Sequence, residues 1–171
     1  IEKTDPEVYD RLDTRREAMK SFAKASGRIA LAALPLAFGG MLQKAYGQTP
    51  GAGAIVDTLN FALTLEYLEA NFYTIGVATP GLIPTDIARG ALTTIRDHEN
   101  AHVAFLITAI KSLNATPVSF TADNFDFTGK GAVKDVFSNY DSFLAVAQVF
   151  EDTGVRAYKG QAGNLISNND V

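Results

Sequence analysis

Hydrophobic residues recur every three or four positions along three long stretches of the chain, and this spacing predicts three helices. The first stretch runs from 54 to 76, the second from about 85 to 113, and the third from about 140 to 162. A Gly/Pro-rich linker at 48–53 precedes the first stretch, and Thr85 is suited to cap the second. We therefore expect an all-α fold.

The residues between the second and third stretches, 115–139, break the helical pattern. Phe120, Phe125 and Phe127 alternate there with polar residues, and residues 130–136 are expected to form a short helix. A connection of this length occurs once in some four-helix bundles, where the chain crosses the bundle between two parallel helices. The aromatic residues should pin this crossover to the side of the bundle.

Composition narrows the classes of function. The chain is 47% hydrophobic and 20% charged, as expected of a globular protein, and its net charge of -4 argues against nucleic-acid binding. It contains no cysteine, which excludes disulfides and thiolate metal sites. Any bound metal must be held by carboxylate, imidazole, carbonyl or water, a donor set that suits iron or manganese.

The N-terminal segment has the layout of an export signal. Arg15 and Arg16 precede an apolar run at 29–42 and small residues at 45–47, which resembles a twin-arginine signal. We expect export to the periplasm or cell envelope, with the signal either cleaved or retained so that residues 15–45 contact a membrane or a partner. The alternative is an amphipathic helix that begins with basic residues.

The second predicted helix carries Glu99 and His102, three residues apart and therefore on one face, where both could bind the same metal ion. The alternative is a polar helix face that happens to contain histidine. His98 is the only other histidine, and we expect it beside the site or on the surface. The pair belongs to a stripe that should face the core: Leu92, Ile95, Glu99, His102, Leu106 and Ile110.

Two further carboxylates repeat a common pattern. Glu66 precedes Tyr73 by seven residues on the first helix, and Glu151 precedes Tyr158 by seven on the third. Seven residues make two turns, so each tyrosine should lie on the face of its glutamate. Glu66 lies in an apolar run and should be buried, which is costly unless the carboxylate is paired or bound to metal. Glu69 shares the stripe of Glu66, and for Glu69 a side chain at the edge of the stripe that reaches water is a reasonable alternative.

This order of motifs resembles the ferritin-like superfamily: Glu and Tyr on one helix, Glu-x-x-His on the next, a long crossover, then Glu and Tyr again. The run at 59–73 is similar to bacterial exported, desiccation-related ferritin-like proteins. The resemblance implies an antiparallel four-helix bundle over residues 51–171, preceded by the signal or anchor and linker at 1–50. It also implies a dinuclear iron or manganese site.

Within that resemblance, Glu66 would be the terminal ligand of one metal ion, Glu99 would bridge, and His102 would bind the first ion. Glu151 would be the terminal ligand of the second ion. Tyr73 and Tyr158 would be catalytic neighbours of these ligands.

The resemblance also calls for a fourth helix with a second Glu-x-x-His, which is absent from the sequence. Together with a first residue, Ile1, that is not an initiator, this suggests that the sequence is part of a longer chain. We expect a redox metalloprotein linked to peroxide or dioxygen, of ferroxidase or catalase type. The alternative is a non-catalytic subunit of a homo-oligomer or larger complex, docked through its N-terminal segment.

Overall fold

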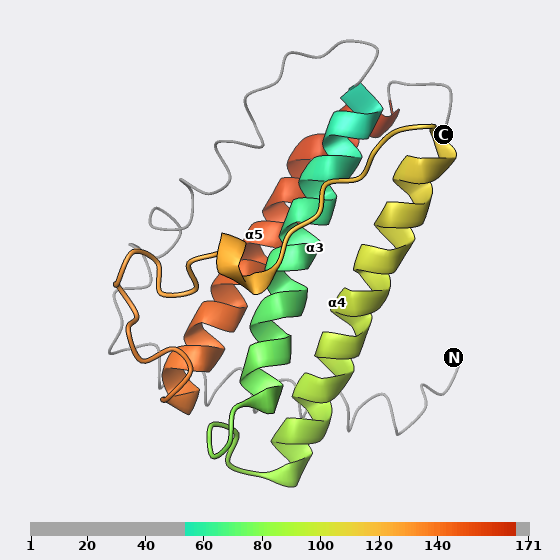
Figure 1. The fold of residues 1–171 in the computed structure, drawn as a ribbon. Coiled ribbons are helices and arrows are strands. Elements are labelled where there is room, and N and C mark those ends of the chain that lie inside the picture. The colour runs from blue at the N-terminus through green and yellow to red at the C-terminus, as the bar shows by residue number, and fades with distance from the viewer. Residues whose placement is uncertain (1–53, 167–171) are drawn as a thin grey trace, which may run out of the picture.

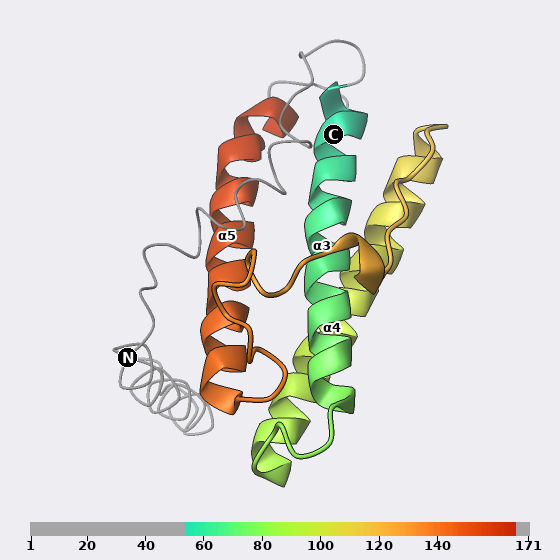
Figure 2. The same cartoon turned by 60° about the vertical axis from the view of Figure 1, so that its left-hand side comes forward.

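Three long helices form the fold in the computed structural model, which describes residues 54–166. They are α3 (Ala54–Ala78), α4 (Asp86–Ser112) and α5 (Tyr140–Ile166), with a short 3₁₀ helix, η2 (Ala122–Asn124), between the last two. In Figures 1 and 2, α3 lies between α4 and α5 and runs antiparallel to both. The expected all-α fold is confirmed, and each of the three predicted long helices is present.

Helix α3 is apolar around most of its circumference because it is covered on several sides. Helices α4 and α5 both pack on it but hardly touch each other, and η2 packs on it as well. Phe72 is fully buried at the centre of the larger core, where its ring stacks on Phe143 at 4.6 Å and meets Phe150 edge-on at 5.0 Å. Such ring pairs add to the stabilisation that burial alone provides.

Local signals fix both ends of α4. The Thr85 side chain accepts a hydrogen bond from the Ala88 N–H at 3.2 Å, which confirms the predicted N-cap. At the other end Asn114 adopts a positive φ of 54°, and the N–H groups of Leu113 and Ala115 both reach the Ile110 carbonyl. A left-handed residue of this kind stops a helix and satisfies its last carbonyls.

The long crossover follows α3 from one end to the other. The Val118 N–H donates to Asn60 Oδ1 at 2.9 Å, and the Phe120 ring meets Tyr67 edge-on further along. Phe127 then packs against Phe72. The crossover therefore returns the chain to the end where α4 began, so that α4 and α5 run parallel (Figure 1), as the sequence predicted.

The prediction of a short helix at 130–136 is wrong. That stretch consists of turns, and the regular turn of the crossover is instead η2. Gly129, Lys130 and Gly131 all have positive φ values, of 60°, 59° and 83°, which right-handed helix cannot accommodate. The Asp126 carboxylate holds this turn by accepting the N–H groups of Thr128 and Lys130.

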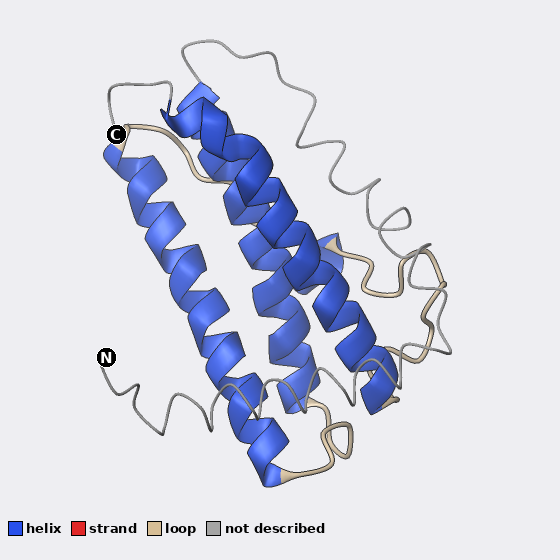
Figure 3. Ribbon diagram, turned by 180° about the vertical axis from the view of Figure 1, so that it is seen from behind, coloured by secondary structure: helices blue, strands red, loops and turns tan. Residues whose placement is uncertain are grey.

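Within residues 54–166, one side of the three helices is left open between α4 and α5, as Figure 3 shows from behind. Ile87 and Phe105 on α4 are 85% and 70% exposed, and Val155 on α5 is also exposed.

No helix within 54–166 is long and apolar enough to span a bilayer. The predicted export signal at 15–45 lies outside the described residues.

Candidate metal centre

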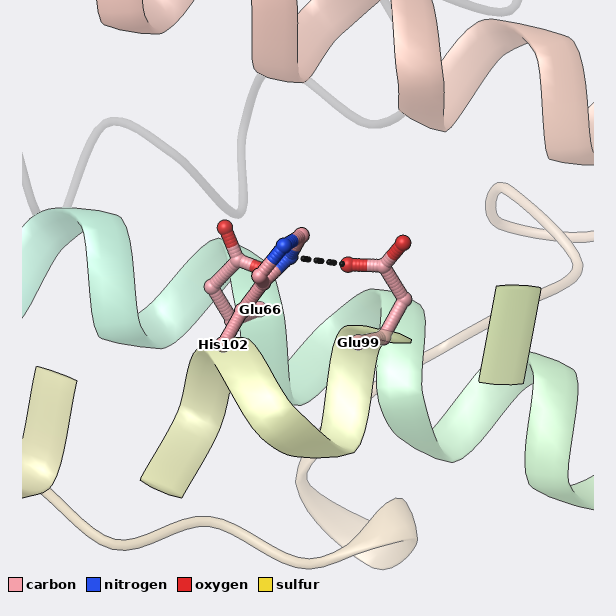
Figure 4. A group of neighbouring side chains, drawn as sticks. All are labelled: Glu66, Glu99 and His102. Atoms are coloured by element: carbon pink, nitrogen blue, oxygen red, sulfur yellow. Dashed lines mark hydrogen bonds and ion pairs between the residues drawn. The ribbon is translucent and has the colours of Figure 1, made fainter. Parts of the chain in front are cut away.

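Three predicted ligands meet at one point between α3 and α4. Glu66 and Glu99 are buried, and one ligand atom from each, with one from His102, lies within 4.8 Å of the other two. His102 Nδ1 is 3.0 Å from Glu66 Oε2 and 3.0 Å from Glu99 Oε2. Figure 4 shows the three side chains converging from the two helices. We call these residues the trio.

The helical spacing explains this meeting. Glu99 and His102 are one turn apart on α4, and Glu66 lies opposite on antiparallel α3. Glu99 is buried as predicted, whereas the His102 side chain is 56% exposed. The prediction that both face the core therefore holds for Glu99, while His102 lies at the edge, toward the open side of the unit. Its ring is accessible from solvent, and His98 is exposed.

The charges of the trio are strongly coupled. Burial and a hydrogen bond with Glu66 raise the pKa of Glu99 to about 7, although the bond with His102 opposes this. Burial alone would lower the pKa of His102, but its hydrogen bond with Glu99 and the charges of Glu66 and Glu99 raise it. Two carboxylates and one imidazole thus compete for protons in a small space. A divalent cation bound there would neutralise the negative charge of the two carboxylates.

Each tyrosine of the repeated pattern bonds to the glutamate of the other helix. Tyr73 of α3 donates to Glu151 Oε1 at 2.7 Å, and Tyr158 of α5 donates to Glu66 Oε1. Burial comes first, and the partner carboxylate second, among the causes that raise the pKa of both phenols. Both phenols therefore stay protonated and hold the carboxylates in place as donors.

The structure brings together Glu66, Glu99 and His102, and it links Glu66 to Tyr158. Glu151 and Tyr73 form a separate pair. Glu151 is exposed and is not part of the group within 4.8 Å.

Of the two positions left open for Glu69, the structure shows the buried one. Glu69 is only 6% exposed and does not reach water from the edge of the stripe. Burial, followed by the charges of Glu151, Glu66 and Glu99, raises its pKa to about 9. The signal available was position: Glu69 is three residues after Glu66 and four before Tyr73, so it must lie between them on the same face.

Comparison with known proteins agrees with this architecture. The family model described as a ferritin-like domain matches residues 54–171, which is more than half of the chain. The chain therefore belongs to the ferritin-like domain family. No curated protein and no solved structure matches the sequence significantly.

The donor chemistry fits a metal of the kind this family implies. Carboxylate oxygens and one imidazole nitrogen, with no thiolate, suit iron or manganese. His102 Nδ1 faces two carboxylate oxygens at equal distance, although a single N–H cannot point straight at both. A cation at the centre of the trio would satisfy all three atoms at once.

Proposed function

We propose that the chain holds a carboxylate-bridged dinuclear iron or manganese centre and uses it for redox chemistry with dioxygen or peroxide. The observation that carries the proposal is the trio, two buried carboxylates and an imidazole drawn from two helices within 4.8 Å. A bound metal pair would supply the electron-transfer and oxygen-binding chemistry.

The protein's own residues would have distinct tasks. Glu66 and His102 would bind the first ion, Glu99 would bridge, and Glu151 would bind the second. Tyr158 and Tyr73 would orient the outer oxygens of Glu66 and Glu151 by donating hydrogen bonds to them. The exposed edge of His102 leaves a route for a small oxidant from solvent.

Metal binding should be tested with the full 171-residue chain, by elemental analysis after dialysis against Mn²⁺ or anaerobic Fe²⁺. His102→Ala and His98→Ala are a matched pair, because both remove a histidine from α4 and only His102 belongs to the trio. We expect His102→Ala to lower the affinity for the first ion at least ~10-fold and to abolish peroxide-dependent or dioxygen-dependent turnover. Equal metal content and turnover in both variants would contradict the proposal.

A non-catalytic assembly role is the second candidate. The observation that favours it is the exposure of two large apolar side chains on α4, Ile87 and Phe105, which a partner would cover. A chain that binds no metal yet forms a defined oligomer, measured by light scattering, would support this role over the first.

The proposal also includes export to the periplasm or cell envelope, on the strength of the twin-arginine-like layout at 15–45. Mass spectrometry of the N-terminus from the native host tests it. A mature start near Gln48 is expected if the signal is removed, and retention of the segment would support the anchor.

A further inference from the structure

Helix α4 carries both histidines of the chain on its exposed side. His98 and His102 are four residues apart, a spacing that puts two side chains on one helix face with about 5–6 Å between their Cβ atoms. Both residues are exposed, and the His102 side chain is 56% exposed. Two imidazoles in the order His-Glu-x-x-His on a helix can bind one metal ion from its surface.

The orientation of the His102 ring leaves its outer nitrogen available. Its two contacts with Glu66 and Glu99, each of 3.0 Å, are both made by Nδ1. An ionised carboxylate only accepts hydrogen bonds, so Nδ1 carries the hydrogen and the lone pair of the neutral ring is on Nε2. Histidines that bind metal commonly donate their other N–H to a carboxylate, which fixes the ring and makes the free nitrogen a better ligand. His102 has this arrangement before any ion binds.

The His98 ring is free to turn toward the same ion. Among residues 54–166 it makes no hydrogen bond or ion pair. The adjacent Asp97 is paired with Arg96 at 2.7 Å, and the Asn100 amide donates to the Arg96 carbonyl at 2.8 Å, so neither holds the imidazole. Because both histidines belong to one helix, the geometry of the helix sets the distance between them, and no contact between helices is needed.

We propose that His98 and His102 form a second metal site, the outer site, which binds one Zn²⁺ or Cu²⁺ ion through a ring nitrogen of His98 and Nε2 of His102. Water fills the remaining positions of the ion. Imidazole suits these two ions, and a given set of nitrogen donors binds them more tightly than it binds Mn²⁺ or Fe²⁺. The inference goes beyond the dinuclear centre, because the outer site needs neither Glu151 nor a second ion.

The outer site and the trio compete for His102. An ion in the trio takes the lone pair of Nδ1, which faces the carboxylates, whereas an ion in the outer site takes the lone pair of Nε2. A neutral imidazole has one lone pair on its two nitrogens, so occupation of one site excludes the other. Zn²⁺ in the outer site keeps the Nδ1 hydrogen directed at Glu66 and Glu99, and it thereby keeps Mn²⁺ or Fe²⁺ out of the trio.

The test titrates the full chain with Zn²⁺ and with Mn²⁺ by calorimetry, and counts the nitrogen ligands of one equivalent of Cu²⁺ by electron paramagnetic resonance. Three variants are compared with the wild type. His98→Ala removes a ligand of the outer site and should fold, because His98 is exposed. His98→Ala/Asn100→His keeps two histidines but breaks their four-residue spacing. Glu66→Gln removes a carboxylate of the trio and keeps an oxygen that can accept from Nδ1.

We expect Cu²⁺ to have two nitrogen ligands in the wild type and one in His98→Ala. The Zn²⁺ affinity of His98→Ala should fall at least ~10-fold, while its Mn²⁺ affinity stays within about 2-fold of the wild type. The double variant should bind Zn²⁺ as weakly as His98→Ala. Glu66→Gln should bind Mn²⁺ at least ~10-fold more weakly and still show two nitrogen ligands on Cu²⁺. Wild-type protein loaded with Zn²⁺ should no longer bind Mn²⁺.

The inference is overturned if the wild type binds no Zn²⁺, or if His98→Ala binds it as tightly as the wild type, because the ion would then lie in the trio. Recovery of the affinity in the double variant would also overturn it, since the spacing would not matter. Unchanged Mn²⁺ binding after Zn²⁺ loading would contradict the exclusion. The proposed function fails separately, if zinc-free wild type binds no Mn²⁺ or if His102→Ala leaves Mn²⁺ binding unaffected.

Discussion

Replacing Glu69 with glutamine should stabilise the metal-free protein at neutral and alkaline pH. In the folded protein the carboxyl faces Glu66 on its own helix, Glu99 on α4 and Glu151 on α5, and its pKa is raised from 4.5 to about 9. Between these two pKa values the folded protein binds one proton more than the unfolded chain. Its stability is therefore fully present below the unfolded pKa and falls as the pH rises toward the folded pKa.

The size of the effect follows from the same pKa values. One proton difference changes the free energy of unfolding by about 1.4 kcal/mol per pH unit, so a rise from about pH 5 to about pH 8 costs up to ~4 kcal/mol. Glutamine keeps the shape and removes the ionisation, so Glu69→Gln should regain about 2–4 kcal/mol at about pH 8 and very little at about pH 4. In a domain of this size, the corresponding rise in Tm is on the order of 10 °C.

Urea unfolding is followed by circular dichroism at half-unit pH steps with chelator present. The measurement gives the slope of the free energy of unfolding against pH. Asp152→Asn serves as the control, since it removes an exposed carboxylate and should leave the slope unchanged. Glu99 also has a raised pKa, of about 7, so a smaller dependence should remain in Glu69→Gln. Equal slopes in the wild type and Glu69→Gln would refute the reasoning, because Glu69 would then ionise in the fold without cost.

Two other substitutions test the packing. Gly76→Ala should destabilise the fold by about 1–3 kcal/mol, because a Cβ there would lie 2.5 Å from Phe143 Cζ and still closer to Cε2 inside a filled core. Gly90→Ala, where nothing lies within 4 Å, should be neutral or stabilising, and a similar fall in Tm for both would contradict the packing argument. Tyr73→Phe should cost about 1–2 kcal/mol in thermal unfolding, because Glu151 loses its donor, and an unchanged Tm would show that water replaces the phenol.

The three helices and the burial of Glu66 and Glu99 could be predicted from the sequence, because both depend on local periodicity. The burial of Glu66 and Glu99 follows from apolar neighbours one turn away. The exposure of His102 could not be predicted in this way, because it depends on how far α4 and α5 stand apart, a tertiary distance. The same spacing that placed Glu99 inward leaves His102 at the edge of the stripe.

Two features escaped prediction for different reasons. The contact of Glu69 with α5 could not be predicted, because Gly154 is 85 residues later in the sequence and no local pattern on α3 indicates a glycine opposite. The segment at 130–136 was predicted to form a short helix, whereas Gly129 and Gly131 favour left-handed backbone there. In that segment the backbone requirement of the turn outweighs helix propensity.

The crossed tyrosine bonds have a consequence for how α3 and α5 are aligned. Tyr73 to Glu151 and Tyr158 to Glu66 tie the two helices together at points two turns apart. If α5 slid along α3 by one turn, about 5.4 Å, both bonds would break together, and Tyr73 and Tyr158 would lose their present partners. The two bonds therefore fix the register of α5 relative to α3. This register in turn sets the spacing of the carboxylates in the proposed metal centre.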